Sequence, residues 1–437
     1  MTSTKFESKP LFTRQQLTAL LLPLIAEQAL SVTIGLADTL MVSSVGEAAV
    51  SGVSLVDTFN TLMIQIMTAL ATGGAVVASQ YIGHREEKNA RAAAAQILFI
   101  MSSFSVLVAA VVVVGRHAIL RGIFGAIDAD VMRYAETYFL LSALSYPFIG
   151  LYNAGAALFR AQGNSKISMM SSLVMNVVNI GGNAILIFGF GMGVMGAALA
   201  SLISRAVACC AVLFLLQKPD CMLRITGLSA LRPDGGLIRR ILRVGIPAGI
   251  ENGMFQIGKL SVASLTSTLG TAAIAANAVS MAVLTVVGQC LGAGEKEQAV
   301  WYARRLLLVA YCGAWVMNLS GFFFADRWAL SWFNLSPEAS AMALEVMMWF
   351  NIVSLFFWPS SFTLPNILRS AGDASFTMAV SIVSMWVFRV GFCYLWVLRM
   401  GGGLLSIWMG MYLDWVFRSL CFAVRFVRGR WLEKTVI

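Results

Sequence analysis

Charged residues are scarce in this sequence. Asp, Glu, Lys and Arg together make up 12% of its 437 residues, whereas 59% are hydrophobic and the mean hydropathy is +0.80. A water-soluble protein carries roughly twice this share of charged residues. The scarcity excludes large soluble domains, because the apolar side chains must face lipid. We therefore expect an integral membrane protein whose fold class is all-α.

Histidines and paired cysteines are also nearly absent. The chain has 2 His and 7 Cys, the cysteines form no CxxC motif, and their number is odd. These features argue against a disulfide framework and against a zinc site. HExxH, GxSxG and Walker A motifs are missing as well. We expect no enzyme activity, no cofactor, no metal site and no ATP-driven step.

Apolar runs bounded by charges, Gly or Pro fill most of the chain. A membrane-spanning helix takes about 20 apolar residues. The runs predict twelve transmembrane helices, six before and six after a polar linker. Their ranges are 17–42, 48–80, 92–115, 135–158, 167–190, 193–216, 243–268, 272–291, 303–324, 341–365, 375–398 and 402–424.

The two halves of the chain repeat each other. Pro23 and Glu27 match Pro247 and Glu251 at one constant offset in residue number. At a second, smaller offset, the segment SQYIG matches GQCLG and the segment FRAQGN matches LRSAGD. Each repeat holds six spans, so both enter the membrane from the same side. We expect two pseudosymmetric six-helix bundles around a central cleft: an N-terminal lobe (1–217), a linker (218–242) and a C-terminal lobe (243–437) whose eighth span is about four turns short.

The net charge of +10 does not indicate a nucleic-acid partner. Of the 31 Lys and Arg residues, 23 lie in the termini and in alternate connections, on one side of the predicted membrane. Because cytoplasmic loops carry an excess of Lys and Arg, this bias predicts that both termini are cytoplasmic and the linker too. The first apolar run is expected to remain as a helix, since Glu27 interrupts it and further spans follow.

Ionisable side chains inside spans are candidates for function because each costs several kcal/mol unless it is paired or hydrated. Glu27 and Asp38 are 11 residues apart, which returns them to one helical face about 16 Å apart, so that both can face one cavity. Glu27 is a candidate residue of the substrate cavity. Asp38 is the candidate cation-binding acid, although an interfacial carboxylate has the same pattern. Amide oxygens of Asn153, Asn179 and Asn183 are candidate cation ligands, with hydrogen bonding between helices as the alternative.

Other polar residues predict the wall of a substrate cavity. Asp57 and Gln65 belong to a polar stripe of the second span, which lipid does not accommodate. Glu251, Asn252, Gln256 and Lys259 cluster on the seventh span, where Glu251 and Lys259 can instead neutralise each other. Asp414 lies at the repeat position of Arg205 and four residues before Arg418, which favours a structural ion pair.

Several segments resemble the multidrug and toxic compound extrusion (MATE) transporters. They are LPLIAEQALSVTIGLADTLMVSSVGEAAVSGVS, ASQYIGHREEKNA and FRAQGNSKIS in the first half, and GIPAGIENGMFQ, VVGQCLGAGEKEQA and LRSAGDASF in the second. The resemblance covers nearly the whole chain. Asp38 matches the acid of the family's first helix, where cation binding is thought to occur. Asn179 and Asn183 match positions where one branch carries polar or acidic partners.

The resemblance implies a cation-coupled antiporter in a plasma membrane of bacterial type. It would export small organic, lipophilic cations in exchange for H⁺ or Na⁺, contact membrane lipids and act as a monomer. Two other functions stay open: a flippase for lipid-linked precursors, against which the sparse bases of the predicted cavity argue, and a polytopic membrane enzyme. A short eighth span also leaves open a transporter with an impaired second lobe.

Overall fold

A computed structural model describes residues 10–125, 128–225, 232–262, 270–333, 337–392, 395–396, 404–434 and 436–437. Within these ranges the chain forms helices joined by short turns and contains no β-strand. The predicted all-α fold class is therefore confirmed. Seven of the described helices are long and apolar enough to cross a membrane. The number of twelve spans stays a prediction.

The first half contains six long helices. Helix α1 starts after Thr13, whose hydroxyl accepts from the Gln16 amide while the Gln16 side chain accepts from the Thr13 amide, a reciprocal cap. The helices are α1 (Arg14–Ser43), α2 (Glu47–Gly83), α3 (Glu87–Phe124), α4 (Ala129–Ala161), α5 (Ser165–Asn183) with its π-helical continuation η1 (Ala184–Gly189), and α6 (Gly193–Leu216).

The second half repeats this order. Its helices are α7 (Gly235–Val262), α8 (Gly270–Gly292), α9 (Lys296–Phe333), α10 (Pro337–Ser370), α11 (Ala374–Ser384) continued by the π-helix η4 (Met385–Phe392), α13 (Leu404–Val427) and the short η5 (Arg430–Glu433). Helix α7 begins inside the segment predicted as linker. Helix α8 has 23 residues and α2 has 37. Residues 263–269, directly before α8, lie outside the described residues, so the shortening of the eighth span stays a prediction.

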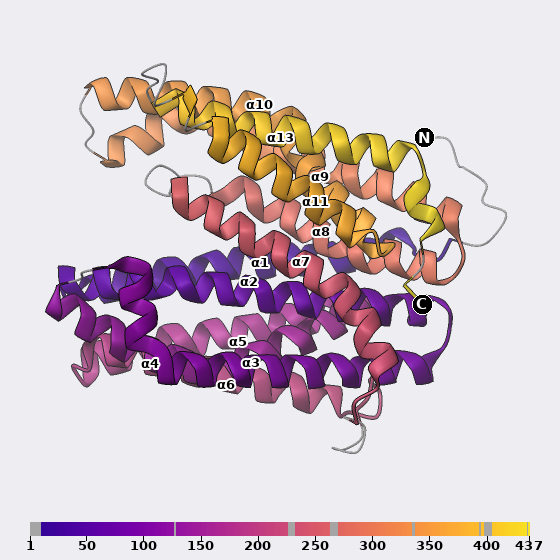
Figure 1. The fold of residues 1–437 in the computed structure, drawn as a ribbon, viewed down its shortest axis with the longest axis horizontal. Coiled ribbons are helices and arrows are strands. Elements are labelled where there is room, and N and C mark those ends of the chain that lie inside the picture. Colours follow the sequence, from indigo (N-terminus) through magenta and orange to yellow (C-terminus); the bar gives the residue numbers. More distant parts are fainter. Residues whose placement is uncertain are drawn as a thin grey trace.

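The halves form two bundles that lie side by side, the first half below and the second above in Figure 1. The first helix of each half crosses between them. Leu20 and Leu24 of α1 are buried in the apolar core of the second bundle, and Ile241 and Val244 of α7 in that of the first. This reciprocal exchange joins the two bundles at the end of the molecule where both described chain ends lie (Figure 1).

Two symmetric contacts close this end. A Cβ atom on Gly83 of α2 would lie 2.1 Å from the carbonyl oxygen of Gln289, and one on Gly292 of α8 would lie 2.0 Å from that of Gln80. The Gln80 side chain donates to the carbonyl oxygen of Ser370 (2.7 Å), and Gln289 donates to that of Ala161 (2.6 Å). Each second helix thus caps the fourth helix of the opposite bundle.

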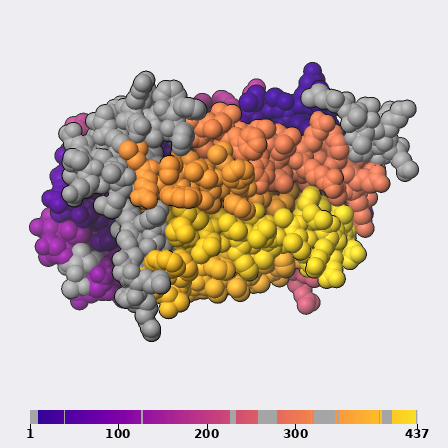
Figure 2. All heavy atoms as spheres, turned by 90° about the horizontal axis from the view of Figure 1, so that it is seen from above, coloured from indigo at the N-terminus to yellow at the C-terminus, as the bar shows by residue number. Residues whose placement is uncertain are grey.

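The outside of the molecule is strongly apolar. Val114, Phe190 and Val427 expose 88%, 73% and 83% of their surface, values that are unfavourable in water over so many large side chains. Figure 2 shows one face of the molecule, on which α13 (yellow) lies among segments of the second half (orange and salmon). These side chains face lipid when the helices span a membrane.

Candidate functional site

A cavity of about 1260 Å³ lies between the two bundles. Both halves contribute to its wall, the first through α1 to α6, the second through α7, α8, α10, α11, η4 and α13. It extends from the Glu27–Arg160 pair to Ile123 and Phe124, at the far end of α3 from the closed contacts. The cleft expected from the repeats is present as a cavity large enough for a drug-sized molecule.

Asp38 lies on the cavity wall in contact with a chain of neutral amides. The Asn183 side-chain amide donates to Asp38, and it also lies 3.5 Å from the Asn179 side-chain oxygen. Asn179 in turn donates to Ser201 of α6 (3.1 Å). Asp38 and Asn179 line the cavity, whereas Asn183 is fully buried behind them. The structure thus brings together three of the four residues predicted to bind a cation.

Asn153 lies elsewhere on the wall. Its side-chain amide approaches the Thr68 hydroxyl of α2 at 3.4 Å, a long hydrogen bond. The polar stripe of α2 lines the cavity at Gln65 and Thr68. Asp57, from the same stripe, is not among the described lining residues; it accepts a hydrogen bond from Asn60 (3.2 Å) behind the wall. Its place in the substrate cavity stays a prediction that this geometry does not support.

Glu27 lines the cavity in an ion pair. Its carboxylate lies 2.9 Å from an Arg160 guanidinium nitrogen and accepts from the Ser168 hydroxyl at 2.8 Å. The side chains of Glu27 and Arg160 are 11% and 13% exposed. Two buried charges in contact, with a hydroxyl that satisfies the remaining lone pairs, make a stable structural unit. The charge of Glu27 is therefore neutralised within the protein.

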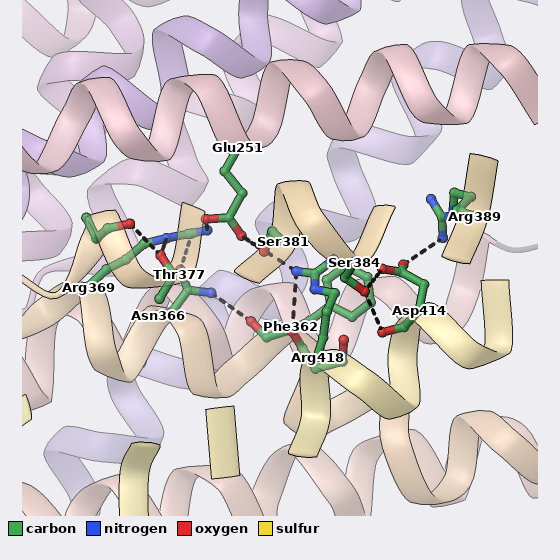
Figure 3. A network of polar contacts seen from close by, with 12 residues as sticks. Glu251, Phe362, Asn366, Arg369, Thr377, Ser381, Ser384, Arg389, Asp414 and Arg418 are labelled. Atoms are coloured by element: carbon green, nitrogen blue, oxygen red, sulfur yellow. Dashed lines mark hydrogen bonds and ion pairs between the residues drawn. The ribbon is translucent and has the colours of Figure 1, made fainter. Parts of the chain in front are cut away.

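Glu251 is the equivalent residue of the second half, and it also pairs with arginine (Figure 3). Arg369, Arg418 and Ser381 contact its carboxylate at 2.5, 3.6 and 2.6 Å. Asn252 and Gln256, the other predicted residues of this helix, line the cavity beside it. The side chain of Lys259 lies outside the described residues, and its predicted role stays a prediction.

The ion pair expected at Asp414 has a different partner. Asp414 lies 3.6 Å from Arg389 of η4 and accepts from Ser384, whereas Arg418 points to Glu251 (Figure 3). The expectation of a structural pair holds, but its suggested partner Arg418 was wrong. The spacing of four residues along α13 favoured Arg418 as the partner of Asp414. In the structure α13 packs against η4, and this contact brings Arg389 to Asp414 instead.

Three arginines of the second bundle were not predicted as cavity residues. Arg369, Arg389 and Arg418 all line the cavity, together with Arg160 and Arg205 of the first bundle. The expectation of sparse cavity bases was therefore wrong. One signal was available, because Glu27 and Arg160 both have repeat partners in Glu251 and Arg369. When both residues of a Glu–Arg pair recur at the equivalent positions of the second half, a contact between them is predicted. The structure contains this contact once in each bundle.

Comparisons with known proteins agree on one family. The MatE family model matches residues 23–185 and 251–395. A "probable multidrug resistance protein NorM" of Thermotoga maritima is 26% identical, over 97% of this chain and 94% of that protein. The "uncharacterized transporter YisQ" of Bacillus subtilis is also 26% identical, over 98% and 97%.

Solved structures have the same fold. One titled "MATE in the bent conformation" has a TM-score of 0.85 at 20% identity and covers 95% of this chain and 94% of its own. Another, described as "Reverse polarity of binding pocket suggests different function of a MOP superfamily transporter from Pyrococcus furiosus Vc1 (DSM3638)", has a TM-score of 0.85 at 21% identity and covers 96% of this chain and 97% of its own. At these identities the likeness concerns the fold alone.

Proposed function

This chain belongs to the MatE family, and from that membership we propose that it is an antiporter that exports small organic compounds in exchange for H⁺ or Na⁺. The family match confirms the resemblance drawn from the sequence motifs. It also supports an integral membrane transporter rather than an enzyme, because relatives over nearly the whole chain are named as transporters and resistance proteins.

One observation carries the proposal of cation coupling. Among the residues that the structure describes, three carboxyl groups line the cavity, and two of them, Glu27 and Glu251, contact arginines. The third, Asp38, contacts the neutral amide of Asn183. A buried carboxylate whose contact partner is neutral is stabilised most by binding H⁺ or Na⁺. The cation neutralises the negative charge, which a neutral amide does not compensate.

Coupling follows if the cation and the cargo occupy the same cavity. A cargo with a positive group and apolar surface favours the charged form of Asp38, and a bound H⁺ or Na⁺ removes that attraction. The two ligands then bind in turn, which is the requirement for exchange. We propose lipophilic organic cations as cargo on this basis, with Met and aromatic side chains of the wall as contacts.

The closed end is proposed to face the cytoplasm. It holds both described chain ends, which the Lys and Arg bias predicts to be cytoplasmic. The cavity then extends toward the outer side of the plasma membrane, where cargo leaves and the coupling cation enters. The protein acts as a monomer in this proposal, because each chain carries both bundles around its own cavity.

The flippase for lipid-linked precursors is a second candidate, and the five cavity arginines favour it. Guanidinium groups suit pyrophosphate headgroups. However, Arg160, Arg369 and Arg389 each have a carboxylate partner within 3.6 Å, so that most of their charge is already balanced. We therefore favour the antiporter.

Dye export from proteoliposomes, with pH and Na⁺ gradients imposed separately, tests the proposal. We expect a lipophilic cationic dye to move when one gradient is present. Asp38→Asn should abolish gradient-driven movement, and Asp130→Asn, which changes an exposed acid at the start of α4, should leave it intact. Undiminished export by Asp38→Asn would contradict the role of this carboxyl.

A further inference from the structure

We propose that the second-bundle wall of the cavity is a subsite for an anionic aromatic group of the cargo, so that the preferred cargo is a zwitterion. Its positive end faces the Asp38 wall and its carboxylate faces Arg418 and Arg389. This inference rests on the export function proposed above. We call the residues Phe255, Phe362, Arg389, Trp415 and Arg418 the arginine–aromatic cluster; all of them line the cavity.

Arg418 is buried with weak polar contacts. Its side chain is 5% exposed, yet its nearest acceptors are Glu251 at 3.6 Å and the Ser361 carbonyl at 3.5 Å. Both are longer than a good N–H···O hydrogen bond. Its Nε has no hydrogen-bond partner among the described residues. A buried cation with long contacts retains much of its desolvation cost, which an anion at the cavity wall would relieve.

Aromatic rings hold this guanidinium in place. Its Cζ lies 5.0 Å from the ring centre of Phe362 and 6.0 Å from that of Phe255. The Cζ of Arg389 lies 5.1 Å from the same Phe255 ring. Two guanidinium groups therefore share one ring and face one region of the cavity. Such cation–π contacts orient both groups, and for Arg418, whose polar contacts are long, they leave N–H donors for an anion.

The charges of this wall do not balance. Among the described residues, Arg369, Arg389 and Arg418 face two carboxylates, Glu251 and Asp414. Glu251 is shared, and Arg369 at 2.5 Å is much closer to it than Arg418 at 3.6 Å. The excess is one positive charge, which matches a monoanion such as a carboxylate. A pyrophosphate carries more negative charge than this wall compensates.

The surroundings favour an aromatic anion over an inorganic one. Phe350, Trp358 and Trp415 line the cavity next to the arginines. The Trp415 indole nitrogen is buried and has no hydrogen-bond partner among the described residues, so that a donor as well as ring faces are present. A flat ring with a carboxylate can stack on these faces while its oxygens accept from Arg418 and Trp415.

The first-bundle wall presents a carboxyl group instead. Glu27 is paired with Arg160, whereas Asp38 on the same wall contacts the neutral amide of Asn183. The cavity thus has a carboxyl with a neutral contact partner on one wall and the weakly paired guanidinium of Arg418 on the other. A cargo that carries an amine and a carboxylate matches both walls at once.

A matched dye pair tests the inference: a cationic xanthene dye with a free carboxylate, and the methyl ester of the same dye. We expect Arg418→Gln to weaken binding of the carboxylate dye to purified protein by about tenfold and to change binding of the ester by less than about twofold. Arg418→Lys should restore part of the loss. Arg133→Gln, an exposed arginine of α4, is the control.

Trp415→Phe provides a second, milder variant, because it keeps a ring and removes only the indole donor. We expect about a threefold loss for the carboxylate dye alone. Equal losses for both dyes in Arg418→Gln and in Trp415→Phe would overturn the inference. Stronger competition by a polyprenyl pyrophosphate in vesicles than by the carboxylate dye would also overturn it, in favour of a lipid precursor.

The failure of the export function has a different signature. If the carboxylate dye binds in an Arg418-dependent manner and no gradient drives its movement in proteoliposomes, the proposed function fails while the subsite stands. If gradients drive both dyes and Arg418→Gln affects them equally, the export function stands and the subsite fails.

Discussion

The two bundles share a framework and differ in the residues that line the cavity. Each has a buried Glu–Arg pair between its first and fourth helices, Glu27–Arg160 and Glu251–Arg369. Beyond this pair the repeat positions diverge: those of Asp38, Asn179 and Asn183 are Val262, Phe388 and Phe392, and that of Arg205 is Asp414. Equivalent backbones thus carry an acid with amides on one wall and arginines with aromatic rings on the other.

This difference teaches what repetition preserves. The Glu–Arg pairs neutralise themselves and join helices, a task that both bundles need. A group that binds a ligand is needed in only one of the two bundles. A cavity whose two walls differ in charge can bind a cargo whose two ends differ in charge. We therefore interpret the shared pairs as structural and the divergent residues as functional.

We expect the largest loss of stability when the Glu–Arg pairs that both bundles share are broken. The loss should be larger for the pair of the second bundle than for that of the first. Glu251→Gln leaves two buried guanidinium groups, and we expect a loss of about 3–5 kcal/mol of unfolding free energy. Glu27→Gln leaves only one, at a more exposed site, and should cost about half as much. Thermal unfolding of the purified protein in detergent measures both; equal shifts would contradict this ranking.

We expect the second-largest effect from substitutions at the closed end, where α2 and α8 meet. Gly292→Val places side-chain atoms where a Cβ already meets the Gln80 backbone at 2.0 Å, so that the second helices must separate at a cost of about 1–3 kcal/mol. We expect the closed end to open, detected as labelling of a cysteine introduced there. Gly122→Val, at a position with nothing within 4 Å, is the control. Unchanged labelling in Gly292→Val would show that these contacts do not hold the end closed.

The side-chain hydrogen bonds of Gln80 and Gln289 between the bundles should contribute less to stability than the glycine contacts, and the two should contribute equally. Gln80→Ala and Gln289→Ala each remove one side-chain hydrogen bond to a helix end, worth about 1 kcal/mol. The double variant should show the sum, because the two bonds lie on different helices. Unfolding temperatures of the three variants test this; a large effect of only one glutamine would break the symmetry of the closed end.

The smallest effect concerns a turn that the repeats build differently. Arg85, after α2, has a φ of 61°, and its repeat partner after α8 is Gly294 with a φ of 77°. A side chain in this left-handed region is strained. We expect Arg85→Gly to stabilise by less than about 1 kcal/mol and Gly294→Ala to destabilise by about 1 kcal/mol. Opposite signs in unfolding temperature are the expected result, and a shared sign would contradict it.

Much of the fold followed from the sequence. The apolar runs and repeats predicted the helices, the central cleft and the equivalence of Glu27 with Glu251, because burial against lipid and duplication leave direct traces. The grouping of Asp38 with Asn183 was predicted from their polarity inside spans together with the resemblance to the MATE family, and their contact agrees with it. The pairing of Asp414 with Arg389 did not, since it depends on how α13 and η4 face each other, which no spacing within one helix reveals.

The cation dependence of dye binding tests the division between the two walls most directly. The measurement is the affinity of the methyl ester dye at several pH values and Na⁺ concentrations, for the unmodified protein, Asp38→Asn and Arg418→Gln. We predict that Asp38→Asn loses the dependence on the coupling cation and that Arg418→Gln keeps it. A dependence that persists in Asp38→Asn, or that disappears in Arg418→Gln, would contradict the account.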